Sequence, residues 1–131
     1  MRYRLDYQLT HDIDWFFLYN GIAYHAASNG GLLPDKVDSR KNRMLQETLE
    51  DIDGEYQVRM TDWAKQQDED FTTFRDYAAK GFVSLDRNED DGGRLRYHIV
   101  AFPANGEVFE DENLLRLMPV LNDNEIEITE R

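Results

Sequence analysis

The sequence contains no cysteine, so disulfide bonds, thiolate metal sites and cysteine nucleophiles are excluded. It also lacks the G-K-[ST] of phosphate-binding loops and the G-x-S-x-G motif that presents the nucleophile of many serine hydrolases. No spacing of histidine and carboxylate residues is strong enough to predict a metal site. We therefore expect no cofactor and no metal, and the sequence contains no motif that identifies an enzyme.

Long apolar runs are missing as well. The first residues, MRYRLDYQLTHDID, lack the apolar core of a secretory signal. One uncharged run, residues 15–34, has the length of a membrane span, but Asn20, His25 and the Gly30-Gly31 pair would be costly or helix-breaking in lipid. These features favour a soluble cytoplasmic protein that does not enter a membrane.

Basic residues are scarce. The chain has 15 Lys and Arg against 27 Asp and Glu, a net charge of −12, and residues 104–131 alone have eight acidic and two basic side chains. Such a surface repels the phosphates of nucleic acids and anionic lipids, so we expect neither as a ligand. It favours a basic protein partner electrostatically, and the alternative is that the charge serves solubility alone.

Length and composition indicate one folded domain. The chain has 131 residues, of which 40% are hydrophobic, and this is enough to form a core. We expect a single globular domain over residues 1–121. An acidic segment over residues 122–131, with few apolar residues beyond Ile126 and Ile128, is expected to be peripheral.

The clearest local signal is a β-hairpin. Residues 13–19 and 22–28 flank Asn20-Gly21, the strongest two-residue turn signal between strands. The alternative is one continuous helix over residues 13–29, because several apolar residues also recur at helical spacing.

The remaining pattern mixes strands and helices. The predicted strands are 2–9, 55–60, 82–86, 94–102 and 125–129, and the predicted helices are 39–52, 61–80 and a short one at 113–118. This order favours an α+β fold: a mainly antiparallel sheet with an N-terminal meander or hairpin, two main helices packed on the sheet and one short helix. We further expect one core shared by the sheet and the helices, formed by Trp15, Phe17, Tyr24, Phe71 and Phe74.

Four sequence blocks resemble a family of small, uncharacterised bacterial proteins. The blocks are HDIDWFF (11–17), HAASNGGLLP (25–34), KGFVSLDR (80–87) and YHIVAFP (97–103), and together they span most of the chain. The resemblance implies a single-domain bacterial protein. It implies no activity, and no residue role follows from it.

Asp14 and His25 are the first candidate catalytic residues. The hairpin register pairs Phe16 with His25, which places Asp14 and His25 on one face as diagonal neighbours, roughly 7–8 Å apart at Cα. A carboxylate beside an imidazole is the basic unit of general-base catalysis. The alternative is a buried pair that satisfies its own hydrogen bonds. His98 is a further candidate.

Arg94, Arg96 and His98 alternate along one predicted strand and therefore share a face. Arg94 and Arg96 are candidate ligand-binding residues, since they would form an anion-binding patch in an otherwise acidic protein. The alternative is that they neutralise the acidic loop RNEDDGG (87–93) beside them.

Two functions remain open from the sequence. The first is a non-enzymatic, acidic accessory or interaction domain that binds a protein partner, in the manner of a regulator or an immunity protein that masks a basic effector. The alternative is a small hydrolase or ligand-binding enzyme that uses Asp14 and His25. An open cleft at His25 would support the enzyme, whereas a buried His25 would oppose it.

Overall fold

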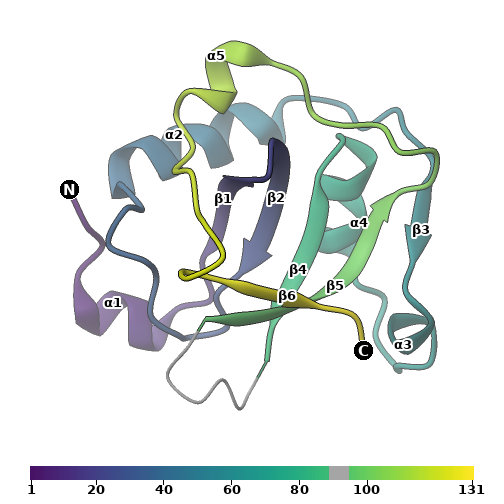
Figure 1. Cartoon of the computed structure of the whole chain (residues 1–131), viewed down its shortest axis with the longest axis horizontal. Helices are drawn as coiled ribbons and strands as arrows, with labels where there is room; N and C mark the ends of the chain where they lie inside the picture. The colour runs from purple at the N-terminus through teal and green to yellow at the C-terminus, as the bar shows by residue number, and fades with distance from the viewer. Residues whose placement is uncertain (89–94) are drawn as a thin grey trace.

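The computed structural model describes residues 1–88 and 95–131 and arranges them around a curled sheet of six strands (Figure 1). The strands are β1 (Asp14–Tyr19), β2 (Ile22–Ala27), β3 (Val58–Met60), β4 (Val83–Arg87), β5 (Arg96–Pro103) and β6 (Glu127–Thr129). Their order across the sheet is β1-β2-β4-β5-β3, and β6 pairs with β5. The helices are α1 (Leu5–Thr10), α2 (Ser39–Glu50), α3 (Asp62–Lys65), α4 (Thr72–Ala79) and α5 (Glu112–Leu115).

The α+β content agrees with the prediction, but the sheet is mixed rather than mainly antiparallel. β1–β2, β4–β5 and β3–β5 are antiparallel pairs, whereas β2–β4 and β5–β6 are parallel. The chain leaves β2, forms α2, β3, α3 and α4, and returns to start β4 at the same end as β2. Such a long crossover is what makes two neighbouring strands parallel, and local sequence patterns do not reveal it.

The predicted hairpin is confirmed in its register. Phe16 lies opposite His25, and Tyr19 lies opposite Ile22. Asn20 and Gly21 both have positive φ, +51° and +77°, as a type I′ turn requires. The alternative of one helix over this stretch is therefore excluded.

A helix over residues 5–10 replaces the strand predicted over residues 2–9. The alternation that suggested a strand also places side chains four residues apart, which is helical spacing. In α1 (Leu5–Thr10) this spacing stacks Tyr7 on Tyr3, with ring centroids 5.7 Å apart. The buried Gln8 side chain fixes the helix by donating to the Tyr3 carbonyl at 2.8 Å.

The helix predicted over residues 61–80 is interrupted and becomes α3 and α4. Phe71 adopts a left-handed conformation, with φ +50° and ψ +36°, directly before α4. The Asp70 carboxylate then accepts the N–H of Thr72 at 3.1 Å, which stabilises the start of a new helix. The helix predicted from residue 39 is confirmed as α2, and Asp38 caps it.

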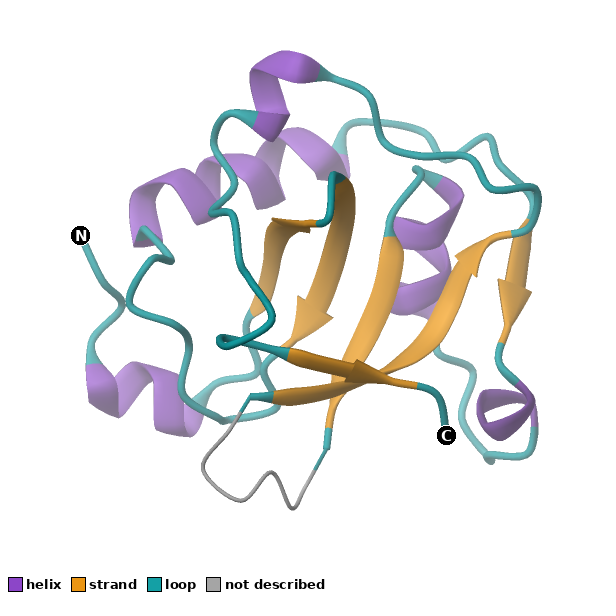
Figure 2. Cartoon of the chain, viewed as in Figure 1, coloured by secondary structure: helices purple, strands orange, loops and turns teal. Residues whose placement is uncertain are grey.

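The sheet buries side chains on both faces, so the single shared core that we predicted is wrong. α2 and α4 lie behind the sheet in Figure 2, and α4 packs most against β5 and β4. Trp15 and Phe17 belong to a cluster on the opposite face, inside the curl formed with β6, whereas Phe71 packs with α3, α4 and β5. A strand covered on both sides offers two cores because successive side chains point to opposite faces.

The C-terminal residues contact the sheet through strand pairing and through the apolar side chains of Ile126 and Ile128. β6 pairs with β5, and Ile126 is 1% exposed in the cluster that contains Trp15 and Phe17. The division between a domain over residues 1–121 and a peripheral segment over 122–131 stays a prediction about stability, which truncation tests.

Candidate functional site

The structure joins His25 to two polar side chains in a continuous hydrogen-bonded chain. His25 Nε2 lies 2.8 Å from Asp14 Oδ1, and His25 Nδ1 lies 3.1 Å from Ser84 Oγ. An ionised carboxylate only accepts, so Nε2–H donates to Asp14, and in the neutral ring Nδ1 accepts from the Ser84 hydroxyl. The order Asp–His–Ser and the donor and acceptor roles match those of a hydrolase triad, but the two ring nitrogens are exchanged, because the triad histidine donates from Nδ1–H to the carboxylate and accepts from the serine at Nε2.

This Asp14–His25–Ser84 chain is closed to solvent at His25 and Ser84 and open only at Asp14. His25 and Ser84 are 0% exposed, and the Asp14 side chain is 33% exposed. The Tyr77 ring stacks on the imidazole, with centroids 4.2 Å apart, and covers it from α4. Burial and the Asp14 charge also raise the pKa of the Tyr77 hydroxyl, which keeps that group neutral. A nucleophile needs access to its substrate, and the Ser84 hydroxyl has none.

Asp14 also connects the chain to α2. The side chains of Asn42 and Gln46 both donate to its backbone carbonyl, at 2.9 Å and 2.6 Å. These contacts tie α2 to β1 at the point where the carboxylate meets His25. The surroundings of the Asp14–His25–Ser84 chain are therefore those of a structural polar network, in which each member has a partner.

The second histidine candidate, His98, is buried in a different group of side chains. It is 2% exposed on β5, its Nδ1 lies 2.6 Å from Asn88 Oδ1, and its ring meets that of Trp63 edge to face at 4.6 Å. Among the described residues, His98 Nε2 has no hydrogen-bond partner. Burial and the Arg131 charge lower the pKa of His98 to about 4, so the ring is neutral at neutral pH.

Asp86 lies directly across the sheet from His98 and is also perturbed. Burial raises the pKa of Asp86 to about 6, against the effect of a hydrogen bond from the Arg87 N–H. Within residues 1–88 and 95–131, no hydrogen bond joins His98 to Asp14 or His25. The structure thus brings Asp14 and His25 together and leaves His98 apart from them.

The two arginine candidates have different outcomes. Arg94 lies outside the described residues, as does most of the acidic loop beside it. Arg96 forms an ion pair with Glu127 on β6, with Nε and Oε2 2.7 Å apart. In the part of the chain that the structure describes, no group of three or more His, Asp or Glu side chains is placed to hold a metal ion.

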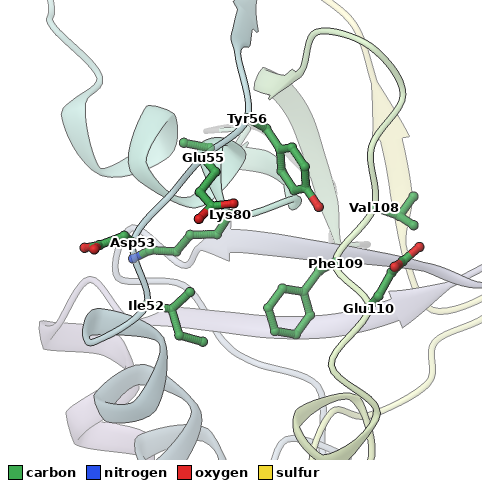
Figure 3. A pocket seen from close by; sticks show the side chains of 9 residues that line it. Ile52, Asp53, Glu55, Tyr56, Lys80, Val108, Phe109 and Glu110 are labelled. Carbon is green, nitrogen blue, oxygen red and sulfur yellow. The ribbon is translucent and has the colours of Figure 1, made fainter.

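A separate pocket contains none of these candidates, although its lining residue Lys80 lies over the Tyr77 ring that covers His25. The acidic pocket, as we call it, has a volume of about 280 Å³ and is lined by Ile52, Asp53, Glu55, Tyr56, Ala79, Lys80, Val108, Phe109 and Glu110 (Figure 3). It lies between the segment after α2, the end of α4 and the segment before α5. Figure 3 shows Asp53, Glu55 and Lys80 on one side, Val108 and Glu110 on the other, and Ile52 and Phe109 below.

Backbone hydrogen bonds hold the walls of the acidic pocket. The N–H groups of Glu55 and Tyr56 both donate to the Ala79 carbonyl, and the N–H of Phe109 donates to the Gly81 carbonyl, at 3.0 to 3.1 Å. Gly81 has φ +110°, and a Cβ there would lie 2.7 Å from the Phe109 nitrogen. Glycine is therefore required for the close approach of the two segments.

Both outer walls come from segments without a basic residue. Residues 44–58 contain five carboxylates and no Lys or Arg, and residues 104–115 contain four carboxylates and no Lys or Arg. Lys80 is the basic residue that lines the pocket, and its ammonium lies 5.1 Å from the centre of the Tyr77 ring. Sequence reasoning missed this site, although the two runs without Lys or Arg were visible; what it could not show is that they meet.

Comparisons of the chain with protein-family models, with curated proteins and with solved structures found no match. No helix among the described residues is long and apolar enough to cross a membrane. Inference about function therefore depends on the geometry above.

Proposed function

We propose that this protein is a non-enzymatic interaction domain that binds a basic protein partner through the acidic pocket and the carboxylates around it. The observation that supports this function is the meeting of segments 44–58 and 104–115, which have nine carboxylates between them, at a pocket with apolar side chains. Complementary charge steers association and disfavours wrong partners. A regulator or immunity protein that masks a basic effector is one concrete form of this function.

The lining of the acidic pocket has the composition of a contact surface. Tyr56 and Val108 are each 37% exposed, and Phe109 lies beneath them at 8%. Apolar side chains that remain in water, surrounded by charged groups, are typical of protein-binding sites. The same carboxylates repel phosphate, so we propose neither nucleic acid nor an anionic membrane as the ligand.

Affinity capture followed by reconstitution tests the proposal. The protein is immobilised, exposed to a bacterial lysate at low and high salt, and any retained protein is identified, purified and titrated against it. We expect a basic partner whose binding weakens with salt and drops about tenfold or more in the variant Asp53→Asn/Glu55→Gln/Glu110→Gln, because three rim charges are lost. Equal binding by this variant would contradict the proposal.

A control variant separates the pocket from net charge. Asp62→Asn/Asp68→Asn/Glu130→Gln removes three exposed carboxylates outside both acidic segments and changes the total charge equally. We expect it to bind the partner within about twofold of the unmodified protein, apart from a small long-range effect. A loss as large as that of the pocket variant would assign the effect to net charge.

The Asp14–His25–Ser84 chain favours a second candidate function, a small hydrolase. Its hydrogen-bond order supports that function and the burial of Ser84 opposes it. A fluorophosphonate probe distinguishes the two, since it labels serine nucleophiles that substrates can reach. We expect no adduct by intact-protein mass spectrometry; an adduct that disappears in Ser84→Ala would favour the hydrolase.

A further inference from the structure

The acidic pocket is large enough to hold one long side chain. Its volume of about 280 Å³ lies just below the range, from about 300 Å³ upward, of pockets that enclose drug-sized ligands. Tyr56 and Val108 are exposed at its edge, so the pocket is accessible to a residue on the surface of another protein.

Aromatic rings and carboxylates line the same pocket. Figure 3 shows the ring of Tyr56 above the pocket and the ring of Phe109 below it. Phe109 is held in place by stacking on Phe82, with ring centroids 4.6 Å apart. Glu55 and Glu110 line opposite walls of the pocket, and Figure 3 shows the Glu110 carboxylate on the outer side of the segment that carries Phe109. A group between the rings therefore has Glu55 on one side and the Glu110 charge farther out on the other.

This combination matches one side chain in particular. The guanidinium of arginine is planar, stacks on aromatic rings and donates in a fork to carboxylates, whereas the lysine ammonium is compact and strongly hydrated. Arginine is also enriched in interface cores, where lysine is depleted. We propose that the acidic pocket binds an arginine side chain of the basic partner; this inference rests on the proposed function and specifies its anchor residue.

Lys80 allows cation binding and anion binding at the acidic pocket to be distinguished. Its positive charge lines the same pocket and would repel an incoming guanidinium. Replacing it with methionine keeps the length of the side chain and removes this repulsion, so arginine binding should strengthen. A pocket that instead bound an anion through Lys80 would lose its ligand in the same variant.

The probes are three blocked tripeptides, acetyl-Gly-X-Gly-amide, in which X is arginine, lysine or citrulline, the neutral counterpart of arginine. Each is titrated into ¹⁵N-labelled protein and followed by NMR. We expect the arginine peptide to shift the amide signals of residues 52–56, 79–80 and 108–110. It should bind about two- to fivefold more tightly than the lysine peptide, and citrulline should bind least.

Matched variants locate the site. Glu55→Gln/Glu110→Gln should weaken the arginine peptide by about fivefold or more, whereas Glu47→Gln/Glu50→Gln, on the same acidic surface but outside the lining, should change its binding less than about twofold. Lys80→Met should tighten it.

The outcomes separate the arginine pocket from the proposed function. Equal binding of the arginine and lysine peptides, with shifts spread over the acidic surface, would overturn the proposal that the acidic pocket binds arginine. The proposal of a basic protein partner would remain supported. Weaker arginine binding in Lys80→Met would also overturn it. Failure of every cationic peptide to bind, together with failure of the capture experiment, would overturn both.

Discussion

The Asp14–His25–Ser84 chain and the acidic pocket are opposite kinds of site in one α+β fold. The first has the residue types of catalysis, each hydrogen-bonded and two of the three fully buried. The second has no histidine or serine among its residues, yet most of them, unlike the buried Phe109, remain accessible. The comparison teaches that residue identity suggests chemistry, whereas exposure decides whether a partner can use it.

The largest test of this comparison removes the buried imidazole. His25→Ala leaves a cavity beneath Tyr77 and takes a hydrogen-bond partner from both Asp14 and Ser84. We expect a loss of about 3–5 kcal/mol in the free energy of unfolding, measured by urea denaturation. The exposed His11 provides the matched control, and His11→Ala should cost less than about 1 kcal/mol. Similar costs for the two would show that His25 is not part of a closed network.

The C-terminal segment, residues 122–131, shares features with both sites. It is acidic in composition, like the surface around the pocket, but it buries Ile126 in the cluster around Trp15. Composition predicts that residues 122–131 are peripheral. Their deletion removes β6 and this buried side chain, so we expect a folded protein whose Tm falls by about 10 °C, equivalent to about 3 kcal/mol. A fall of less than about 2 °C in a calorimetric scan would support a peripheral segment.

A third test acts on the wall of the acidic pocket. A Cβ at residue 81 would require positive φ in a non-glycine residue and would press on the Phe109 nitrogen, so Gly81→Ala should cost about 2–3 kcal/mol and weaken binding at the pocket. Gly106 lies in the same segment as Phe109, also with positive φ, but nothing lies within 4 Å of its added Cβ. Gly106→Ala should therefore cost about 1 kcal/mol and leave binding unchanged; equal effects in denaturation and titration would show that the close approach is not needed.

Local features were predictable from the sequence, and long-range ones were not. The register of β1 and β2 follows from the two-residue turn at Asn20-Gly21, so the residue types alone place Asp14 beside His25. Ser84 could not be placed, because it reaches His25 through the parallel pairing of β2 with β4, 59 residues along the chain. A short alternating pattern is also ambiguous, since residues 2–9 satisfy both strand and helical spacing.

The acidic pocket was unpredictable for the same reason. Its walls come from three separate segments that meet through backbone hydrogen bonds at the turn after α4. Backbone contacts of this kind leave little trace in residue types beyond a glycine such as Gly81. The sequence shows the excess of acidic residues, but only the fold shows where on the surface those residues come together.

The test with the smallest expected effect measures how the free energy of unfolding depends on pH through Asp86 on β4. Asp86 has its pKa raised to about 6 in the folded protein, above its ordinary value of 3.8, chiefly because burial disfavours the charged form. The folded state then binds this proton more tightly than the unfolded state, so the stabilising contribution is complete below pH 3.8 and is lost as the pH rises through 6. At pH 7 the ionised carboxylate is therefore a cost that asparagine, with the same shape and the same acceptor for the Arg87 N–H, would remove.

Asp86→Asn should consequently raise the free energy of unfolding by about 1–3 kcal/mol at pH 7, and the gain should vanish near pH 4. His98 provides the opposite control, because its lowered pKa, about 4, stabilises the fold above pH 6.5 and this contribution is lost as the pH falls toward 4. With Asp86 replaced, the His98 contribution acts unopposed, and stability should fall more steeply between pH 6.5 and 4. Urea denaturation of the unmodified protein and the variant across about pH 4–7 measures these slopes. A gain from Asp86→Asn that persists near pH 4 would contradict the assignment, since it would have to come from packing rather than from the charge.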